Sequence, residues 1–165
     1  MILTTHAVTG ATLATLFPTH PIIGFAVGFS SHFLLDAIPH WDYSLRSMKG
    51  DDKNPMNTDM IINKDFLKDL LKIGADGVLG LLFSCVLLGI IFHNSFFIIL
   101  LGAMAGMIPD ALQFFYFKWK HEPLLSLQRF HIWVHPKINL HDRPVVGVLS
   151  QVVLICFVVF IQFVS

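Results

Sequence analysis

The feature that most constrains the fold of this chain is a series of five long apolar runs. They cover residues 2–17, 21–38, 73–92, 96–117 and 145–164. An α-helix rises about 1.5 Å per residue, so each run is close to the length that a helix needs to cross a bilayer core. The first two runs are short and the first is rich in Thr, which leaves open whether they cross the membrane completely.

The composition places the chain among integral membrane proteins. Of its 165 residues, 55% are hydrophobic and 13% are charged, which is too apolar for an ordinary soluble domain. The length allows a single domain over residues 1–165. We therefore expect an all-α polytopic bundle of about five membrane-spanning helices, with the lipid bilayer as its partner.

The positions of the basic residues predict the topology. With five spans, the N-terminus and the segments 39–72 and 118–143 share one side of the membrane, and every Lys and Arg lies in these two segments. The positive-inside rule then places this side in the cytoplasm, as in a protein of a cell's inner membrane. Acidic residues are interleaved with the basic ones and the formal net charge is zero, so we expect no nucleic-acid partner.

The two cytoplasmic segments differ in kind. Residues 44–58 combine Gly, Pro, Asn and charges, which predicts a mobile loop. Asn63 is a candidate N-cap for an amphipathic stretch that continues into the third span. Residues 118–143 form a second loop, and within it Pro123 and Pro136 bracket a short helix that carries His131 and His135 one turn apart.

A weak internal repeat pairs the first four spans. The first two contain His6xxxGly10 and Gly24xxxGly28xxxHis32xxxAsp36, and the next two contain Asp76xxxGly80 and Gly102xxxGly106xxxAsp110. Small residues spaced by four let helix backbones approach closely. The pattern suggests two repeated helical hairpins followed by a C-terminal span, although small residues at this spacing also occur in membrane helices that are not repeated.

Ionisable side chains gather near the predicted cytoplasmic face. His32 and Asp36 lie four residues apart, as do His131 and His135, so each pair projects from one side of a helix. Asp36, Asp76 and Asp110 bring three negative charges, and no Lys or Arg lies inside a span to neutralise them. Two divalent ions with one bound hydroxide would bring this charge to zero; protonated carboxylates are the alternative. We expect two or three ions, with Zn²⁺ as the best match to His and Asp. The candidate ligands are His6, His32, Asp36, Asp76, Asp110, His131 and His135.

Four short motifs add a resemblance to known proteins. TTHAVTGA, SHFLLDAIPHWDY, GAMAGMIPD and FHIWVH together resemble the membrane-bound metal-dependent hydrolases of the LexA-binding, inner-membrane-associated type. The early His, the HxxxD element and the later HxxxH are also similar in outline to zinc-dependent phospholipase C. The resemblance implies a metal-dependent hydrolase of phosphoesters, with His6, His32, Asp36, Asp110, His131 and His135 as ligands. Asp76 rests on the repeat alone, and Ser31-His32 comes earlier in this chain than the family order implies.

These observations lead to a hypothesis of metal-activated hydrolysis. Asp36 or Asp76 would serve as a base, and His141 would protonate the leaving group. Arg129, Lys137 and Arg143 lie near the predicted opening and would bind phosphate. Because the site lies at headgroup depth, we expect a phospholipid or lipid-linked phosphate as substrate.

Two other classes of function compete with this hypothesis. A noncatalytic membrane scaffold would use the glycine faces for packing and the basic loops for anionic lipids or a partner, and it predicts no tightly bound metal. An ion or metal transporter would need polar groups across the midplane, whereas only His20 and His93 lie near the far edge. The transporter is therefore the weaker of the two.

Overall fold

The computed structural model describes residues 1–51, 53–136, 138 and 140–164, and nearly all of its secondary structure is helical. Lys137, one of the predicted phosphate ligands, lies outside the described residues. The all-α fold class is confirmed. The α-helices are α1 (Leu3–Ala14), α2 (Pro21–Asp36), α3 (Lys64–Ser84), α4 (Phe96–Lys118), α5 (Leu124–Val134) and α6 (Pro144–Phe160). The π-helix η2 (Cys85–Ile91) continues α3, and the short 3₁₀ helix η3 (Ile161–Phe163) continues α6.

Three helical stretches among the described residues are long and apolar enough to cross a membrane: Lys64–Ile91, Phe96–Lys118 and Pro144–Phe163. They correspond to the predicted third, fourth and last spans. The first two runs instead form α1 and α2, of 12 and 16 residues. At about 1.5 Å per residue these helices extend only about 18 and 24 Å. Pro18 and Pro39 follow them closely and prevent a longer helix.

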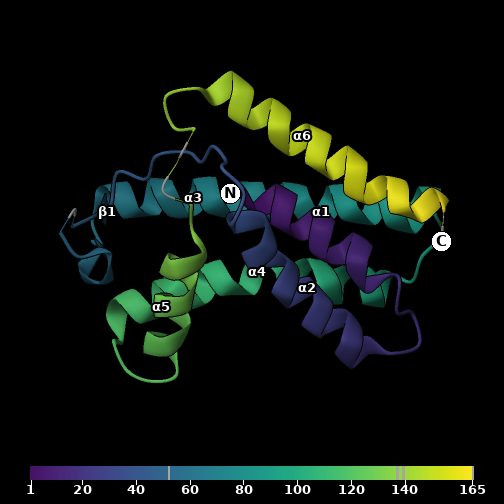
Figure 1. Cartoon of the computed structure of the whole chain (residues 1–165), viewed down its shortest axis with the longest axis horizontal. Coiled ribbons are helices and arrows are strands. Elements are labelled where there is room, and N and C mark those ends of the chain that lie inside the picture. The colour runs from purple at the N-terminus through teal and green to yellow at the C-terminus, as the bar shows by residue number, and fades with distance from the viewer. Residues whose placement is uncertain (52, 137, 139, 165) are drawn as a thin grey trace.

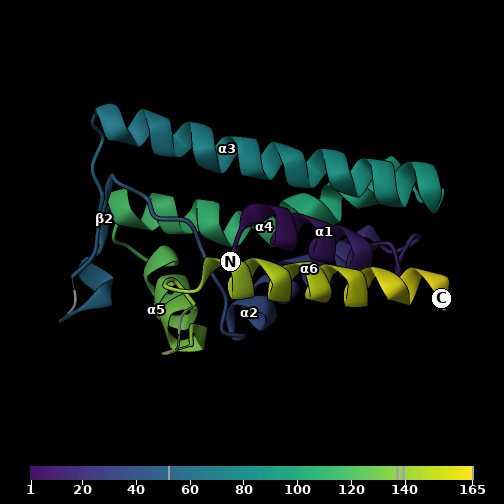
Figure 2. The same cartoon turned by 90° about the horizontal axis from the view of Figure 1, so that it is seen from above.

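Helix α1 forms the centre of the bundle. It contacts α2, α3, α4 and α6, and Figure 2 shows α3 on one side of it and α6 on the other. Nine of its twelve residues are buried, so α1 is a core helix with little surface left for lipid. Ala7 and Ala11 pack there with Leu88, Ile99 and Ala103 in a continuous apolar cluster.

Glycines bring the backbones of α1 and α4 into contact. A Cβ on Gly106 would collide with the carbonyl oxygen of His6, and a Cβ on Gly10 would collide with the carbonyl oxygen of Gly102. The predicted close approach of helices along glycine stripes is therefore confirmed at this crossing. The further idea that α1–α2 and α3–α4 are repeated hairpins stays a prediction.

The first turn of α1 is held by side chains from two other helices. The helix has no side-chain cap of its own. The Asp76 carboxylate of α3 accepts hydrogen bonds from the Leu3 and Thr4 amides, at 2.6 and 3.2 Å, and from the Thr4 hydroxyl at 2.6 Å. Gln151 of α6 accepts from the Ile2 amide and the Thr5 hydroxyl. A buried helix start needs such acceptors, and they also fix the position of His6 one turn later.

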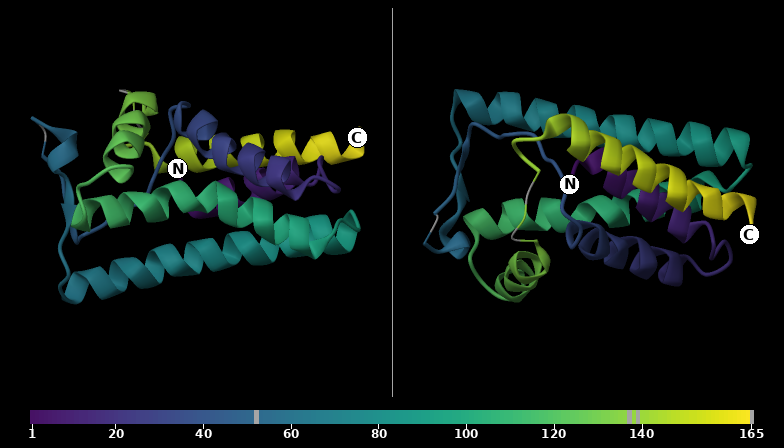
Figure 3. Two further views of the ribbon diagram at one scale, coloured as in Figure 1. Left: turned by 90° about the horizontal axis from the view of Figure 1, so that it is seen from below. Right: turned by 45° about the horizontal axis from the view of Figure 1, so that its top comes forward.

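The remaining elements gather at one end of the bundle's long axis, opposite the C-terminus (Figures 1 and 3). Strand β1 (Met48–Lys49) pairs antiparallel with β2 (Asp59–Met60), and η1 (Pro55–Asn57) lies between them in the sequence. The predicted helix between Pro123 and Pro136 is confirmed as α5, and Asn63 caps α3 as predicted. Ser47 binds Asp69 of α3, so the segment 44–58 contacts the bundle; its mobility stays a prediction.

Candidate metal centre

The centre of the candidate site is the carboxylate of Asp36, the last residue of α2. This side chain is only 1% exposed. Histidine nitrogens from α1, α2, α5 and the segments after α2 and α5 surround it. The Nε2 atoms lie at 2.9 Å (His131), 3.2 Å (His6 and His32), 3.4 Å (His135) and 3.9 Å (His40) from an Asp36 oxygen. The amino nitrogen of Met1 lies 3.2 Å from the same carboxylate, and no Lys or Arg of the described chain pairs with it.

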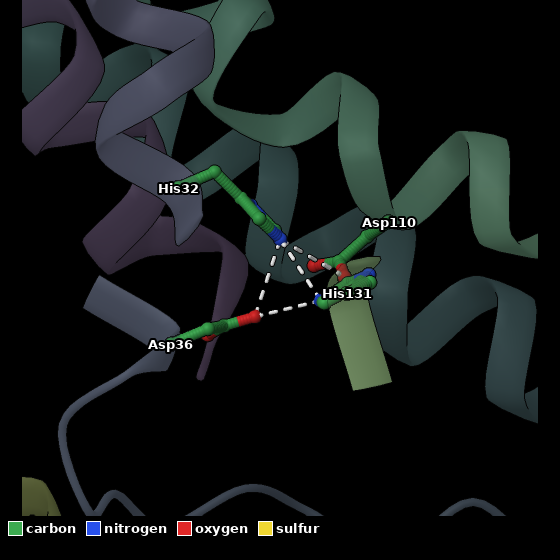
Figure 4. A group of neighbouring side chains, drawn as sticks. All are labelled: His32, Asp36, Asp110 and His131. Atoms are coloured by element: carbon green, nitrogen blue, oxygen red, sulfur yellow. Dashed lines mark hydrogen bonds and ion pairs between the residues drawn. The ribbon is translucent and has the colours of Figure 1, made fainter. Parts of the chain in front are cut away.

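One group of side chains forms an enclosed position. His32, Asp36, Asp110 and His131 each offer one ligand atom, and these atoms lie within 4.8 Å of one another. Figure 4 shows the four side chains pointing toward a common point from α2, α4 and α5. His32 Nε2 lies 3.3 Å from His131 Nε2 and 3.6 Å from Asp110 Oδ1. All but Asp110 are buried.

A second group forms a more open position that shares Asp36. Asp36, His40 and His135 again offer ligand atoms within 4.8 Å of one another. His135 is 42% exposed and lines a partly polar pocket of about 180 Å³. We call this the polar pocket; its lining residues are His40, Asp42, His135, Pro136, Ile138 and His141. An enclosed position beside one with an accessible side is typical of a catalytic rather than a purely structural metal site.

Backbone carbonyls orient two of the histidines toward Asp36. Nδ1 of His32 lies 2.8 Å from the Gly106 carbonyl oxygen, and Nδ1 of His40 lies 2.8 Å from that of Ile38. Because a carbonyl only accepts, Nδ1 carries the proton in both rings, and a neutral ring then directs the Nε2 lone pair at the carboxylate. Burial lowers the pKa of His40 to about 4, which keeps this ring neutral at pH 7. A cation between His40 and Asp36 would stabilise a neutral His40 ring whose Nε2 lone pair faces the carboxylate, and metal-binding histidines commonly have this second hydrogen bond.

The surroundings of His6 also fit a cation ligand. Its ring is completely buried and stacks on His32 with the ring centroids 4.0 Å apart. Neither ring nitrogen has a hydrogen-bond partner among the described residues, although Nε2 lies close to Asp36. Buried polar atoms are rarely left unsatisfied, because each costs about 1–3 kcal/mol. A divalent ion bound by Nε2 would satisfy this nitrogen, and the His and Asp donor set fits such an ion.

Local sequence explains how these side chains meet. The i, i+4 spacing places His32 and Asp36 on one face of α2, and Pro39 ends the helix so that His40 stays beside them. In α4, Pro109 has no N–H to donate to the carbonyl one turn earlier, which loosens the helix at this turn. Gly106, whose carbonyl oxygen accepts from His32, lies in the same turn. α5 crosses the ends of α2 and α4 and carries His131 to the same point.

The structure brings together six of the seven predicted metal ligands: His6, His32, Asp36, Asp110, His131 and His135. Asp76 is the exception, because it belongs to neither group of converging ligand atoms among the described residues. Its oxygens accept the hydrogen bonds of the first turn of α1 and one from the Tyr43 hydroxyl at 3.3 Å, which gives it a structural role. The metal and catalytic roles predicted for it from the repeat stay a prediction.

The predicted substrate-binding residues have different outcomes. His141 lines the polar pocket, and its Nε2 lies 3.2 Å from the Ser44 hydroxyl. Arg129 and Arg143 are exposed, and within the described chain neither forms a hydrogen bond or ion pair with the cluster. The prediction omitted His40 from the ligand set, although its position four residues after Asp36 was a usable signal.

Comparison of the chain with protein-family models, curated proteins and solved structures finds no match. The resemblance of the four short motifs to metal-dependent hydrolases therefore stays an expectation. What can be said of function rests on the side chains around Asp36 and on the membrane-helix character of α3, α4 and α6.

Proposed function

We propose that this protein is a membrane-embedded, metal-dependent hydrolase that cleaves a phosphoester at the membrane surface. The observation that carries the proposal is the pair of adjacent ligand groups that share Asp36, one enclosed and one beside the polar pocket. Two adjacent ligand groups that share a carboxylate would suit phosphoester hydrolysis if they held divalent ions, because attacking and leaving oxygens both need stabilisation there. Zn²⁺ is our choice of ion because imidazole and carboxylate are its common ligands.

The roles of the chain's own residues follow from this arrangement. A divalent ion bound here would supply Lewis-acid chemistry, activating water and polarising a phosphoryl oxygen. The buried side chains of His6, His32 and His131 would hold it in a fixed geometry from three helices. His141, at the wall of the polar pocket, is placed to give a proton to the leaving oxygen. In this arrangement Asp36 would be a shared ligand rather than the base.

The depth of the site supports a substrate from the bilayer. Asp110 lies 14 residues after the start of α4 at Phe96, or about 21 Å along it at a rise of 1.5 Å per residue. If α4 crosses a ~30 Å hydrocarbon core from its first residue, the cluster would lie in the half that is nearer the basic loops. We assign this face to the cytoplasmic side of an inner membrane because every Lys and Arg lies there.

The first experiment measures metal. The protein is purified in mild detergent, and bound metals are counted by elemental mass spectrometry in the wild type and in a His32→Ala, Asp36→Ala double variant. His121→Ala with Asp51→Ala is the matched control, because both residues lie outside the cluster, His121 exposed and Asp51 partly exposed. We expect at least one divalent ion per chain, lost in the first variant and kept in the control. A wild type without metal would favour the scaffold.

The second experiment measures hydrolysis. Lipid phosphoesters in mixed micelles are incubated with the metal-loaded protein, and released phosphate or alcohol is quantified. Chelation should abolish turnover, Zn²⁺ should restore it, and the double variant should lack it under both conditions. Turnover by the double variant at the wild-type rate would exclude this centre as the site of the reaction.

A further inference from the structure

A second pocket lies beside the candidate metal centre and is almost entirely apolar. It has a volume of about 260 Å³ and lies between α6 and the residues that follow α2. We call it the apolar pocket; its lining residues are Met1, Ile38, Pro39, Ser150, Gln151, Val153, Leu154 and Phe157. Ile38, Val153 and Phe157 are all exposed, so the pocket opens on the outer surface of a membrane-spanning helix.

The apolar pocket and the polar pocket are neighbours along the chain. Pro39 lines the first and His40 lines the second. Gly147 allows this segment to lie against α6, since a Cβ there would collide with Trp41. At its inner side the apolar pocket reaches Met1, whose amino nitrogen lies 3.2 Å from Asp36. The two pockets therefore flank residues 38–42, and both end next to the shared carboxylate.

This arrangement matches a molecule with one apolar and one anionic end. Water is excluded from a lipid-facing apolar pocket, so a hydrocarbon chain is the occupant that leaves no polar group unsatisfied there. The polar pocket offers His135 and His141, with the Asp42 carboxylate also in its wall, and an ion at the centre would add positive charge for a phosphate.

We propose that the apolar pocket holds a hydrocarbon chain of a membrane lipid whose phosphate headgroup lies in the polar pocket at the candidate metal centre. The identity of the headgroup rests on the proposed function, whereas the binding of the chain does not. The lipid enters sideways from the bilayer, between α6 and the segment 38–42. A soluble phosphoester with the same headgroup lacks this contact and binds more weakly.

The test fills the pocket with an indole. Leu154→Trp places a large side chain in the apolar pocket, and Leu149→Trp places the same side chain on the same helix at a site that is 58% exposed and outside the pocket. Val153→Trp and Val152→Trp form a second matched pair in case one variant folds poorly. Binding of dioleoyl phosphatidic acid and of glycerol 3-phosphate is measured by native mass spectrometry, with bound metal counted in each sample.

We expect Leu154→Trp and Val153→Trp to weaken binding of dioleoyl phosphatidic acid at least tenfold. Binding of glycerol 3-phosphate and bound metal should change less than twofold, and the two control variants should match the wild type. Equal affinity of pocket and control variants for the lipid would overturn the proposal. The pocket variants could also weaken lipid binding in a protein that holds no metal and shows no turnover. That result would support the binding of the hydrocarbon chain in the apolar pocket and would reject the hydrolase function.

Discussion

At the scale of single residues, the histidines around Asp36 differ in the hydrogen-bond partners of their ring nitrogens. His32 and His40 each have a carbonyl partner for Nδ1, whereas His6 has no hydrogen-bond partner for either ring nitrogen within the described chain. His6 is therefore the side chain whose burial is hardest to explain without a ligand. It also gives the clearest way to separate a metal site from a set of histidine–aspartate ion pairs.

We predict that His6→Leu has opposite effects with and without metal. In chelator-treated protein the change removes two buried unpaired nitrogens at similar volume, so stability should rise by about 1 kcal/mol. With saturating Zn²⁺ the wild type should gain more from the metal than the variant does. Thermal unfolding in detergent with chelator and with Zn²⁺ checks both signs, with His20→Leu at the far edge as control. An equal Zn²⁺-dependent shift in Tm for wild type and variant would contradict a ligand role for His6.

Asp76 leads to a second prediction at this scale. Asp76→Asn weakens the acceptor for the Leu3 and Thr4 amides, and we expect a loss of about 1–3 kcal/mol in stability with bound metal unchanged. Asp65→Asn, at the exposed start of the same helix, should cost well under 1 kcal/mol. Chemical unfolding combined with metal counting distinguishes the roles, because loss of metal without loss of stability would support Asp76 as a ligand.

At the scale of elements, the close crossing of α1 and α4 positions the site. The backbone of Gly106 contacts the backbone of His6, and its carbonyl oxygen also accepts from His32. A single turn of α4 therefore sets the positions of two histidines that belong to different helices. The geometry of the centre depends on this crossing as much as on the ligands.

We predict that Gly106→Ala separates α1 from α4. The added methyl group has no room beside the His6 carbonyl, so stability should fall by about 1–3 kcal/mol and metal affinity should fall with it. Gly74→Ala is the matched control, because a Cβ there meets nothing within 4 Å and should stabilise α3 by up to about 1 kcal/mol. Unfolding curves and metal titration of the two variants test the contrast. Two variants with the same stability would show that the crossing tolerates a side chain.

Spacing within one helix was readable from the sequence, and contacts between helices were not. The pairs His32 with Asp36 and His131 with His135 follow from helical periodicity alone. The role of Asp76 depends on a helix start more than seventy residues earlier in the chain, and no local pattern reveals it. An apolar run has the same appearance whether lipid or other helices cover it, so the sequence predicts a possible span where α1 forms a core helix. Its Thr content and its length were the only indications of a core position.

At the scale of the whole molecule, charge divides the bundle into two ends. The basic residues lie in the segments 39–72 and 118–143, whose elements gather at one end of the long axis (Figure 1). The end of α3 and the start of α4 lie at the other end with the C-terminus. This separation is the basis for assigning the candidate centre to one side of the membrane.

We predict that both basic segments face the cytoplasm. In a background with Cys85 and Cys156 replaced by Ala, Lys53→Cys and Lys120→Cys should react with an impermeant maleimide only in inside-out vesicles. Ser95→Cys, between η2 and α4, should react only in right-side-out vesicles. Labelling of Lys53→Cys from the outer side would reverse the assignment, and labelling of Lys53→Cys and Lys120→Cys from opposite sides would reject the shared face.

The central position of α1 has a consequence for how the protein is made. The ribosome produces this helix before any of the helices that cover it. It is about 18 Å long and has polar residues along it, so a bilayer alone holds it poorly. Its amides at Leu3 and Thr4 find their acceptor only after α3 has been inserted, and Ile2 finds its acceptor only after α6. This early helix thus completes its packing only when α6 is in place, after all the helices that carry the histidine cluster have been made.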